Sequence, residues 1–211
     1  MSRPANVRRE GRPRDSHATK ELLLAAATEE FAEYGFAGAR IDRIAERAGA
    51  NKRLLYVYFG DKDQVFDAVL QRQIGALVEA MPLDPRDLAG FAAARFDYML
   101  ANRQVARLVA WRTVERTEPI EIELRSYQAK LEAIAGAQRD GEVYAAVPAV
   151  DLFAMVLRIT ESWLNAPQAL RALADDEPDS PDRLREHRAA LVDAVRAIAD
   201  PRRAGPGAGR S

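Results

Sequence analysis

The chain has 211 residues and a formal net charge of −1, and 48% of its residues are hydrophobic. It contains no cysteine, which excludes disulfide scaffolds, thiolate metal sites and cysteine nucleophiles, and which fits a reducing cytoplasm. It has no apolar run of about 18 residues or more, so the sequence predicts no membrane span. No apolar run that could serve in a signal peptide follows the basic N-terminus, so no signal peptide is predicted.

The composition is rich in Ala, Leu, Arg and Glu and poor in β-branched residues, which predicts an all-α protein. The charge is unevenly distributed along the chain. Residues 1–60 carry 11 Lys and Arg against 8 Asp and Glu, whereas residues 61–211 carry 20 against 24. A basic end joined to an acidic body indicates that the N-terminal part meets a polyanion, although ordinary charge scatter is an alternative.

The N-terminal residues are polar and basic. Residues 1–16 contain several Arg and Pro residues, so the sequence predicts a flexible basic arm. Its Gly-Arg-Pro segment is similar to arms that place Arg in narrow minor grooves of DNA, although a solvated tail explains it equally well. Apolar residues then recur at helical spacing over 17–34, with Ser16 as the expected N-cap and Gly35 as the left-handed residue that ends the helix.

Two short helices are predicted over 41–48 and 52–58, joined at Gly49. Glycine adopts the positive φ of such a turn without strain. A short helix, a Gly-containing turn and a second helix form the helix-turn-helix, which presents its second helix to the major groove. The residues expected to form the turn, or to pack where the two helices cross, are Ile44, Ala45, Ala48, Gly49, Leu55, Tyr58 and Phe59.

A longer helix is predicted over 61–80, and Asp61 and Gln64 have the spacing of a capping box at its start. Five further helices are predicted in the body, with Asn102 and Ser180 among their expected caps. Their ranges are 85–101, 103–116, 119–140, 148–174 and 181–199. The Gly, Pro and Arg composition of 201–211 predicts a disordered tail. The sequence therefore predicts an all-α fold with about nine helices.

Residues 31–65 read FAEYGFAGARIDRIAERAGANKRLLYVYFGDKDQV, and they resemble the DNA-binding domain of the TetR family of bacterial transcriptional regulators. The resemblance covers about residues 17–70. It includes the pattern LYxYFxxK, which is formed by Leu55, Tyr56, Tyr58, Phe59 and Lys62. The resemblance implies a helix-turn-helix domain over 17–62 and a larger helical domain over 63–200 for effector binding and dimerisation, connected by the helix over 61–80.

Eight residues are expected to meet DNA, and they are Arg40, Asn51, Lys52, Arg53, Leu54, Tyr56, Val57 and Lys62. Arg53 is the candidate for reading guanine, because its guanidinium matches the O6 and N7 acceptors. Asn51 is the expected cap of the third helix and can donate to a phosphate. Leu54 and Val57 can at most touch a thymine methyl group. For Lys52 and Arg53, a solvated surface is the alternative interpretation.

The resemblance implies that Tyr56 and Lys62 grip backbone phosphates. Two features depart from the family pattern. The second helix is preceded by Ala39 and Arg40 in place of a Ser or Thr cap, so the cap is expected to be lost while Arg40 brings a charge toward phosphate. The base-reading positions of the third helix also differ from the Gly, Thr and His that are frequent in the family, so the operator sequence does not follow from the resemblance.

The predicted helices over 148–174 and 181–199 carry long apolar stripes. Part of each stripe is expected to pack into the core, and the resemblance implies a homodimer through these last two helices. The resemblance also implies an effector pocket in the body. Weak candidates for its lining are Phe96, Met99, Trp111, Tyr127, Met155 and Trp163, although aromatic and Met residues at this spacing are more often core.

The expected function is a DNA-binding transcriptional regulator, a repressor by the family's usual outcome, which binds a palindromic operator as a homodimer and is released by a small-molecule effector. An all-helical enzyme or an interaction protein without DNA binding is the alternative. The chain has two His residues, His17 and His187, and no catalytic or His-rich metal motif. The sequence therefore predicts no enzyme activity, no cofactor and no metal, and a cytoplasmic location.

Overall fold

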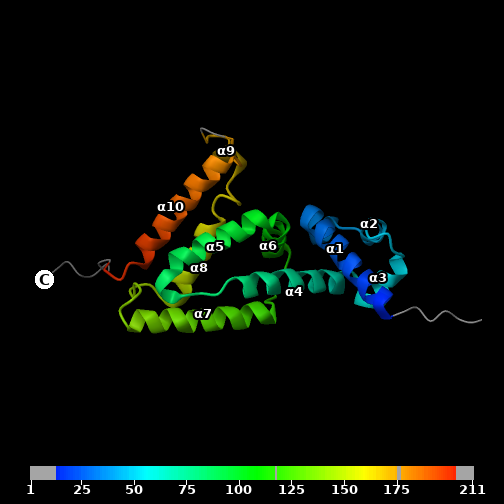
Figure 1. The fold of residues 1–211 in the computed structure, drawn as a ribbon, viewed down its shortest axis with the longest axis horizontal. Coiled ribbons are helices and arrows are strands. Elements are labelled where there is room, and N and C mark those ends of the chain that lie inside the picture. Colours follow the sequence, from blue (N-terminus) through cyan, green and yellow to red (C-terminus); the bar gives the residue numbers. More distant parts are fainter. Residues whose placement is uncertain (1–12, 117, 175–176, 203–211) are drawn as a thin grey trace, which may run out of the picture. The chain divides into compact units, whose positions relative to one another are not determined.

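A computed structural model describes residues 13–116, 118–174 and 177–202. In these ranges the chain forms ten α-helices and one 3-10 helix, labelled η1, which confirms the all-α fold (Figure 1). The chain divides into two compact units after Leu70. The sequence places a boundary between residues 62 and 63, whereas the units divide within α4. We call them the N-terminal unit and the C-terminal unit and describe each by itself.

The N-terminal unit contains α1 (Pro13–Gly38), α2 (Ile41–Arg47), α3 (Lys52–Phe59) and the first part of α4 (Lys62–Ala80). Three aromatic rings form the centre of its core. Phe31 and Phe66 are fully buried with ring centroids 4.8 Å apart, and the Phe36 ring lies 5.3 Å from that of Phe66. This cluster ties the end of α1 to the start of α4.

Helix α1 begins earlier than the sequence predicts. Pro13 to Ser16 are helical, so Ser16 lies inside α1 and does not cap it, and the predicted arm loses its last residues to the helix. Proline suits this position, because its fixed φ matches the first helical turn and its missing N–H needs no partner there. The rest of the arm lies outside the described residues. Gly35 has the predicted positive φ of 68° with a non-helical ψ of −177°, so it interrupts the helix as predicted, and α1 continues after this kink to Gly38.

The C-terminal unit has α5 at its centre, packed against α6, α8 and α10, while α7 packs against α8 and η1 (Figure 1). The helix bounds in this unit are η1 (Pro85–Asp87), α5 (Leu88–Ala101), α6 (Arg103–Glu115), α7 (Glu121–Arg139), α8 (Ala149–Glu161), α9 (Gln168–Arg171) and α10 (Pro181–Ala199). The core of the unit is apolar and continuous from α4 through α10.

The prediction of one long helix over 148–174 is wrong. Helix α8 ends at Glu161, and a turn then leads to the short α9, for which Pro167 is the N-cap. Proline explains the break, because it lacks the N–H of a helical hydrogen bond and disfavours helical backbone at Ala166 before it. The Trp163 indole N–H donates to the carbonyl of Pro178 at 2.9 Å, which holds the non-helical segment in place.

The helix termini test the predicted caps. Asp61 and Gln64 form the predicted capping box, in which each side chain accepts a hydrogen bond from the backbone N–H of the other. The Ser180 hydroxyl caps α10 as predicted. Asn102 does not cap α6 with its side chain, because its amide donates to the Tyr98 carbonyl at the end of α5.

Two other predicted helix starts shift, and part of the predicted tail is ordered as a turn. The helix predicted from residue 85 begins as η1 and becomes α-helical at Leu88, where the Asp87 side chain caps it. Helix α7 begins at Glu121, two residues after the predicted start. Residues 201 and 202 of the predicted disordered tail form a turn in which Arg202 binds Asp200, and 203–211 lie outside the described residues.

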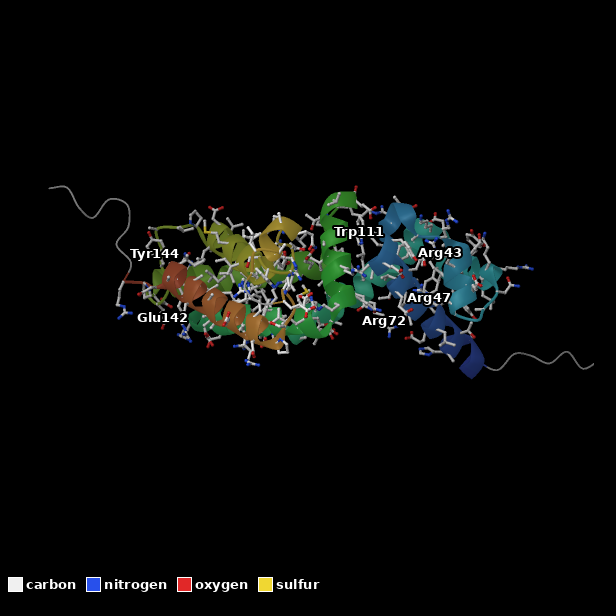
Figure 2. The ribbon with its side chains drawn as sticks, turned by 90° about the horizontal axis from the view of Figure 1, so that it is seen from above. Arg43, Arg47, Arg72, Trp111, Glu142 and Tyr144 are labelled. Carbon is white, nitrogen blue, oxygen red and sulfur yellow. The ribbon has the colours of Figure 1, made fainter. Side chains whose placement is uncertain are left out.

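The loop between α7 and α8 closes onto two other elements. Glu142 forms an ion pair with Arg86 at 2.8 Å, and the backbone N–H of Tyr144 donates to the carbonyl of Ala199 at 3.0 Å. Figure 2 labels Glu142 and Tyr144. The loop therefore connects η1 with the end of α10. Across the described residues, no helix has the length and apolar content to cross a membrane.

The aromatic cluster predicts a large stability effect for one substitution. Phe66→Ala removes a fully buried ring and leaves a cavity beside Phe31, so it should lower the free energy of unfolding by about 3–5 kcal/mol. Leu22→Ala, at an exposed position of α1, should change it by less than about 0.5 kcal/mol. Urea denaturation followed by circular dichroism measures both, and equal effects of the two substitutions would contradict the assigned core.

Candidate nucleic-acid interface

Helix α3 divides into a buried side and an exposed side. Leu55 is fully buried, whereas Tyr56 and Val57 are 47% and 66% exposed. Arg53 is also exposed, and Leu54 is half-buried. The division follows the helical period, because the buried side packs against α1 and α2 and the opposite side faces solvent.

The start of α3 is organised by its cap. The Asn51 side chain accepts a hydrogen bond from the backbone N–H of Arg53 at 2.8 Å, as the sequence predicts. The Lys52 ammonium lies 2.7 Å from a carboxylate oxygen of Asp42 on α2, and this hydrogen bond raises the pKa of Lys52. Both partners are substantially exposed, so the ion pair is weak and a phosphate can compete for the ammonium.

Arg53 and Arg40 differ from the other cations around α2 and α3. Within the described ranges, no hydrogen bond or ion pair holds either guanidinium, and both residues are exposed. Arg40 is the N-cap residue of α2 and gives no side-chain cap, as the missing Ser or Thr predicts. Exposed guanidinium groups of this kind can donate to a base edge or a phosphate without first breaking an internal contact.

A buried carboxylate fixes the start of α2. Glu30 on α1 is fully buried, and its Oε1 accepts hydrogen bonds from the backbone N–H of Arg40 at 2.9 Å and from Nε of Arg43 at 2.7 Å. The second terminal nitrogen of Arg43 lies 2.6 Å from the same oxygen. The hydrogen bond to Glu30 raises the pKa of the Arg43 guanidinium, which also lies over the Tyr34 ring. We call this set the Glu30 clamp.

The sequence-based list of site residues omits the Glu30 clamp. A signal exists in the sequence, because Glu30 falls on the apolar stripe of α1, three and four residues after the buried Ala27 and Ala26. A carboxylate on such a stripe needs a cationic partner, and the spacing alone does not show which arginine supplies it.

Arg47 adds a second connection between α2 and α1. Its guanidinium lies 3.2 Å from Glu29 and 3.5 Å from Glu33, and Arg43 and Arg47 both extend from α2 (Figure 2). Both arginines of α2 are therefore engaged by carboxylates of α1. Of the described cations expected to meet DNA, Arg40 and Arg53 have no ion pair, whereas Lys52 is paired with the exposed Asp42.

Lys62 lies at the first turn of α4, beside the end of α1. Its ammonium is 4.8 Å from the centre of the Phe36 ring and 3.4 Å from the carbonyl oxygen of Ala37. These contacts position the ammonium without neutralising its charge, so it keeps donors for a phosphate.

The predicted helix-turn-helix core is buried to different degrees. Ile44 and Ala45 are buried, and Ala48 is half-buried. Gly49 is exposed at the turn with φ 60°, the conformation for which glycine is expected. Tyr58 and Phe59 are half-buried, and their rings contact each other. The ammonium of Lys20 on α1 lies 5.4 Å from the centre of the Phe59 ring.

The aromatic and Met candidates for effector binding lie in different environments. Phe96, Met99 and Trp163 are buried in the packed interior, while Trp111 and Met155 are exposed. Tyr127 lines a cavity of about 470 Å³ in the C-terminal unit. The described lining of this cavity includes Tyr127 but none of the other aromatic and Met candidates, and much of it consists of Arg and Glu side chains.

Comparison with known proteins covers both units. The family model described as "Bacterial regulatory proteins, tetR family" matches residues 23–69, and the model "Tetracyclin repressor-like, C-terminal domain" matches 87–197. The HTH-type transcriptional repressor SCO4008 of Streptomyces coelicolor is 36% identical over 191 residues, which cover 89% of this chain and 98% of that protein.

A second relative and a solved structure extend this similarity. The HTH-type transcriptional activator FasR of Mycolicibacterium smegmatis is 37% identical over 116 residues, which cover 51% of this chain and 52% of FasR. The crystal structure of SCO4942 from Streptomyces coelicolor is similar with a TM-score of 0.76 at 37% identity. That match covers 86% of this chain and 98% of SCO4942.

The Glu30 clamp predicts a loss of stability when its carboxylate is neutralised. Glu30→Gln removes the charge that compensates Arg43 and weakens the anchor of α2, so the melting temperature should fall by several degrees. The matched control is Glu46→Gln, at an exposed position of α2. Differential scanning calorimetry measures both variants, and the clamp would be unimportant if they melted at the same temperature.

Proposed function

The chain belongs to the TetR family of DNA-binding transcriptional regulators, and from this premise we propose that it is a repressor that binds a near-palindromic operator as a homodimer and is released by a small-molecule effector. As a TetR-family regulator it is not an enzyme. The observation that carries the proposal is the exposed face of α3, where Arg53, Tyr56 and Val57 face solvent while Leu55 anchors the helix.

The exposed face of α3 has the chemistry of a DNA-reading surface. The Arg53 guanidinium can donate two parallel hydrogen bonds to guanine, and Val57 can contact a thymine methyl group. The same unit also carries donors that phosphate contacts use, on Arg40, Asn51, Lys52, Tyr56 and Lys62. In this proposal Arg53 and Val57 select the sequence, while the surrounding residues set orientation and affinity.

Repression is proposed over activation because of the extent of similarity. SCO4008, whose name describes a repressor, aligns over nearly the whole chain. FasR, whose name describes an activator, aligns over about half of it. Bound at an operator that overlaps a promoter, a repressor excludes the transcription machinery. The alternative of activation predicts an operator upstream of the promoter.

The proposed homodimer uses the outer faces of α8 and α10. Leu191 and Val195 on α10, and Leu152 and Val156 on α8, are buried within the chain and are not available to a partner. The exposed side of α10 carries a series of small residues, Ala189, Ala190, Ala194 and Ala197. On α8, Val150 and Met155 are 56% and 47% exposed.

These faces suit a close helix-to-helix contact between two copies, because small side chains let two helices approach and the exposed apolar groups then leave water. A two-fold dimer would place two copies of α3 about 34–36 Å apart, which is one turn of DNA. The operator would then be a near-palindrome, because each half-site meets an identical surface.

Release by an effector is proposed as a population shift. Helix α4 contributes residues to both units, and Leu77 on α4 lines the cavity of the C-terminal unit. An effector that binds more tightly to one position of α4 would favour that position and change the spacing of the two α3 helices. The shift can be no larger than the difference in effector affinity between the two conformers.

The proposal is tested by a gel-shift experiment with DNA from upstream of the protein's own gene, combined with selection from genomic fragments. We expect a retarded complex that survives excess nonspecific DNA at moderate salt and whose affinity falls as salt rises. Selected fragments should share a near-palindromic sequence. Failure to obtain specific binding from either source would reject the proposed function.

Two substitutions separate base reading from phosphate contact. Arg53→Ala should reduce discrimination between selected and mutated operators, because a bidentate contact to one base contributes about 1–3 kcal/mol of discrimination. Lys62→Ala should weaken binding to all sequences alike and lower the slope of log affinity against log salt by about one charge. Fluorescence anisotropy over a salt series measures both effects. Wild-type behaviour of both variants would place the DNA surface elsewhere.

The dimer face predicts an effect of charge and bulk. Ala190→Arg places a long cation among the exposed small residues of α10, so it should shift the protein from dimer to monomer and weaken operator binding. Ala129→Arg makes the same change at an exposed position of α7 and serves as the control. Sedimentation velocity gives the oligomeric state, and an intact dimer of the Ala190 variant would exclude this face.

A further inference from the structure

The cavity of about 470 Å³ in the C-terminal unit has an unusual lining for an all-helical core. One part of the lining is apolar and includes Leu77, Val109, Ala154 and Leu157. The other part is ionic. The volume of the whole cavity lies within the range of small-molecule sites. A site with one apolar wall and a few convergent polar groups is typical of ligand binding.

The ionic part of the lining is positively charged. Four arginines face two glutamates among the described lining residues, and the four are Arg95, Arg112, Arg116 and Arg158. The two glutamates are Glu123 and Glu161. Arg95, Arg112 and Arg158 each pair with one of these two glutamates, so the three guanidinium groups carry one positive charge more than the two carboxylates balance.

All four carboxylate oxygens of the two glutamates already contact a donor within the protein. Glu123 lies 2.6 Å from Arg112 and accepts the Tyr127 hydroxyl at 3.0 Å, on its other oxygen. Glu161 lies 2.7 Å from Arg95 on one oxygen and 3.2 Å from Arg158 on the other. Each carboxylate oxygen already has a donor, so the lining glutamates have little capacity to bind a cationic ligand.

Arg95 gives an independent indication of a missing acceptor. Its side chain is 6% exposed and one terminal nitrogen binds Glu161, but its buried Nε has no hydrogen-bond partner. Buried donors of this kind normally have an acceptor, and a charged donor without one is costly. An anionic group in the cavity would supply that acceptor.

Two neighbouring groups respond to the same environment. Burial raises the pKa of Tyr127 to about 12, so its hydroxyl remains a donor at neutral pH. On the next turn of α7, burial and the positive charge of Arg95 lower the pKa of Lys130. The lowered pKa of Lys130 is consistent with a site that disfavours added positive charge, whereas the raised pKa of Tyr127 reflects the burial of its hydroxyl.

We propose that the cavity binds an organic anion, with a carboxylate or phosphate group held by Arg95, Arg112 and Arg158 and an apolar body held against Leu77, Val109 and Leu157. The proposal rests on the proposed function in one respect, that this ligand is the effector which releases DNA. Binding itself requires no DNA. Leu77 belongs to α4, which continues into the N-terminal unit, so a ligand against the apolar wall would contact this helix directly.

The test uses four probes with the same eight-carbon chain, which are octanoate, octyl phosphate, 1-octanol and octylamine. Isothermal titration calorimetry of the full chain at neutral pH and without DNA measures their affinities. We expect at least one of the two anions to bind about tenfold more tightly than 1-octanol, because charge-assisted hydrogen bonds strengthen its binding, and octylamine to bind most weakly. The anion that binds more tightly identifies the preferred charged group.

Two variants localise the binding. Arg112→Gln should reduce the affinity for the preferred anion about tenfold while leaving 1-octanol unchanged. Arg158→Gln keeps the proposal testable if the first variant fails to fold, because the Arg158 side chain is 68% exposed and less needed for packing. Arg139→Gln, at an exposed position of α7 outside the described lining, should change neither affinity.

Gel shifts of the unliganded protein on its selected DNA are run in parallel. Equal or tighter binding of 1-octanol or octylamine, or no saturable binding of either anion at millimolar concentration, would overturn the proposal while the regulator function stands. Selective anion binding without any specific DNA binding would support the ligand class and reject the proposed function.

Discussion

The arrangement of the proposed DNA-reading surface depends on one buried carboxylate. Glu30 has no access to solvent, and its Oε1 joins α1 to the backbone of Arg40 and to the guanidinium of Arg43. A buried charge is costly unless it is paired, so this geometry disfavours other positions of α2. Because α2 packs against α3 through the turn at Gly49, the clamp also fixes which side of α3 faces outward.

The helical period of α3 gives it one buried side and one exposed side. Leu55 anchors it in the unit, while Arg53, Tyr56 and Val57 project from the other side. The arginines of α2 contribute to the anchor and not to the exposed charge, since both are engaged by carboxylates of α1. The cationic character of the surface therefore comes from a few side chains around α3. This separation lets the structural residues be tested apart from the reading residues.

Much of this arrangement follows from local sequence patterns. The capping box at Asp61, the positive φ at Gly49 and the phase of α3 each depend on residues within a few positions, and the structure contains them as predicted. Pairings between residues far apart in the chain could not be predicted from the sequence. The partner of Glu30 and the ion pair of Arg95 with Glu161, 66 residues apart, depend on tertiary packing. The break after α8 was missed because apolar spacing continues through it, and the proline signal at Pro167 is the better guide.

The claim that the exposed side of α3 meets DNA can be tested with one tethered cleavage experiment. The chain has no cysteine, so Val57→Cys creates a unique attachment point for an iron chelate that cleaves nearby DNA. The account predicts two cleavage clusters on the selected operator, related by a two-fold axis and about 10 base pairs apart. Diffuse cleavage, or the same clusters from a chelate at Ala129→Cys on the exposed side of α7, would contradict it.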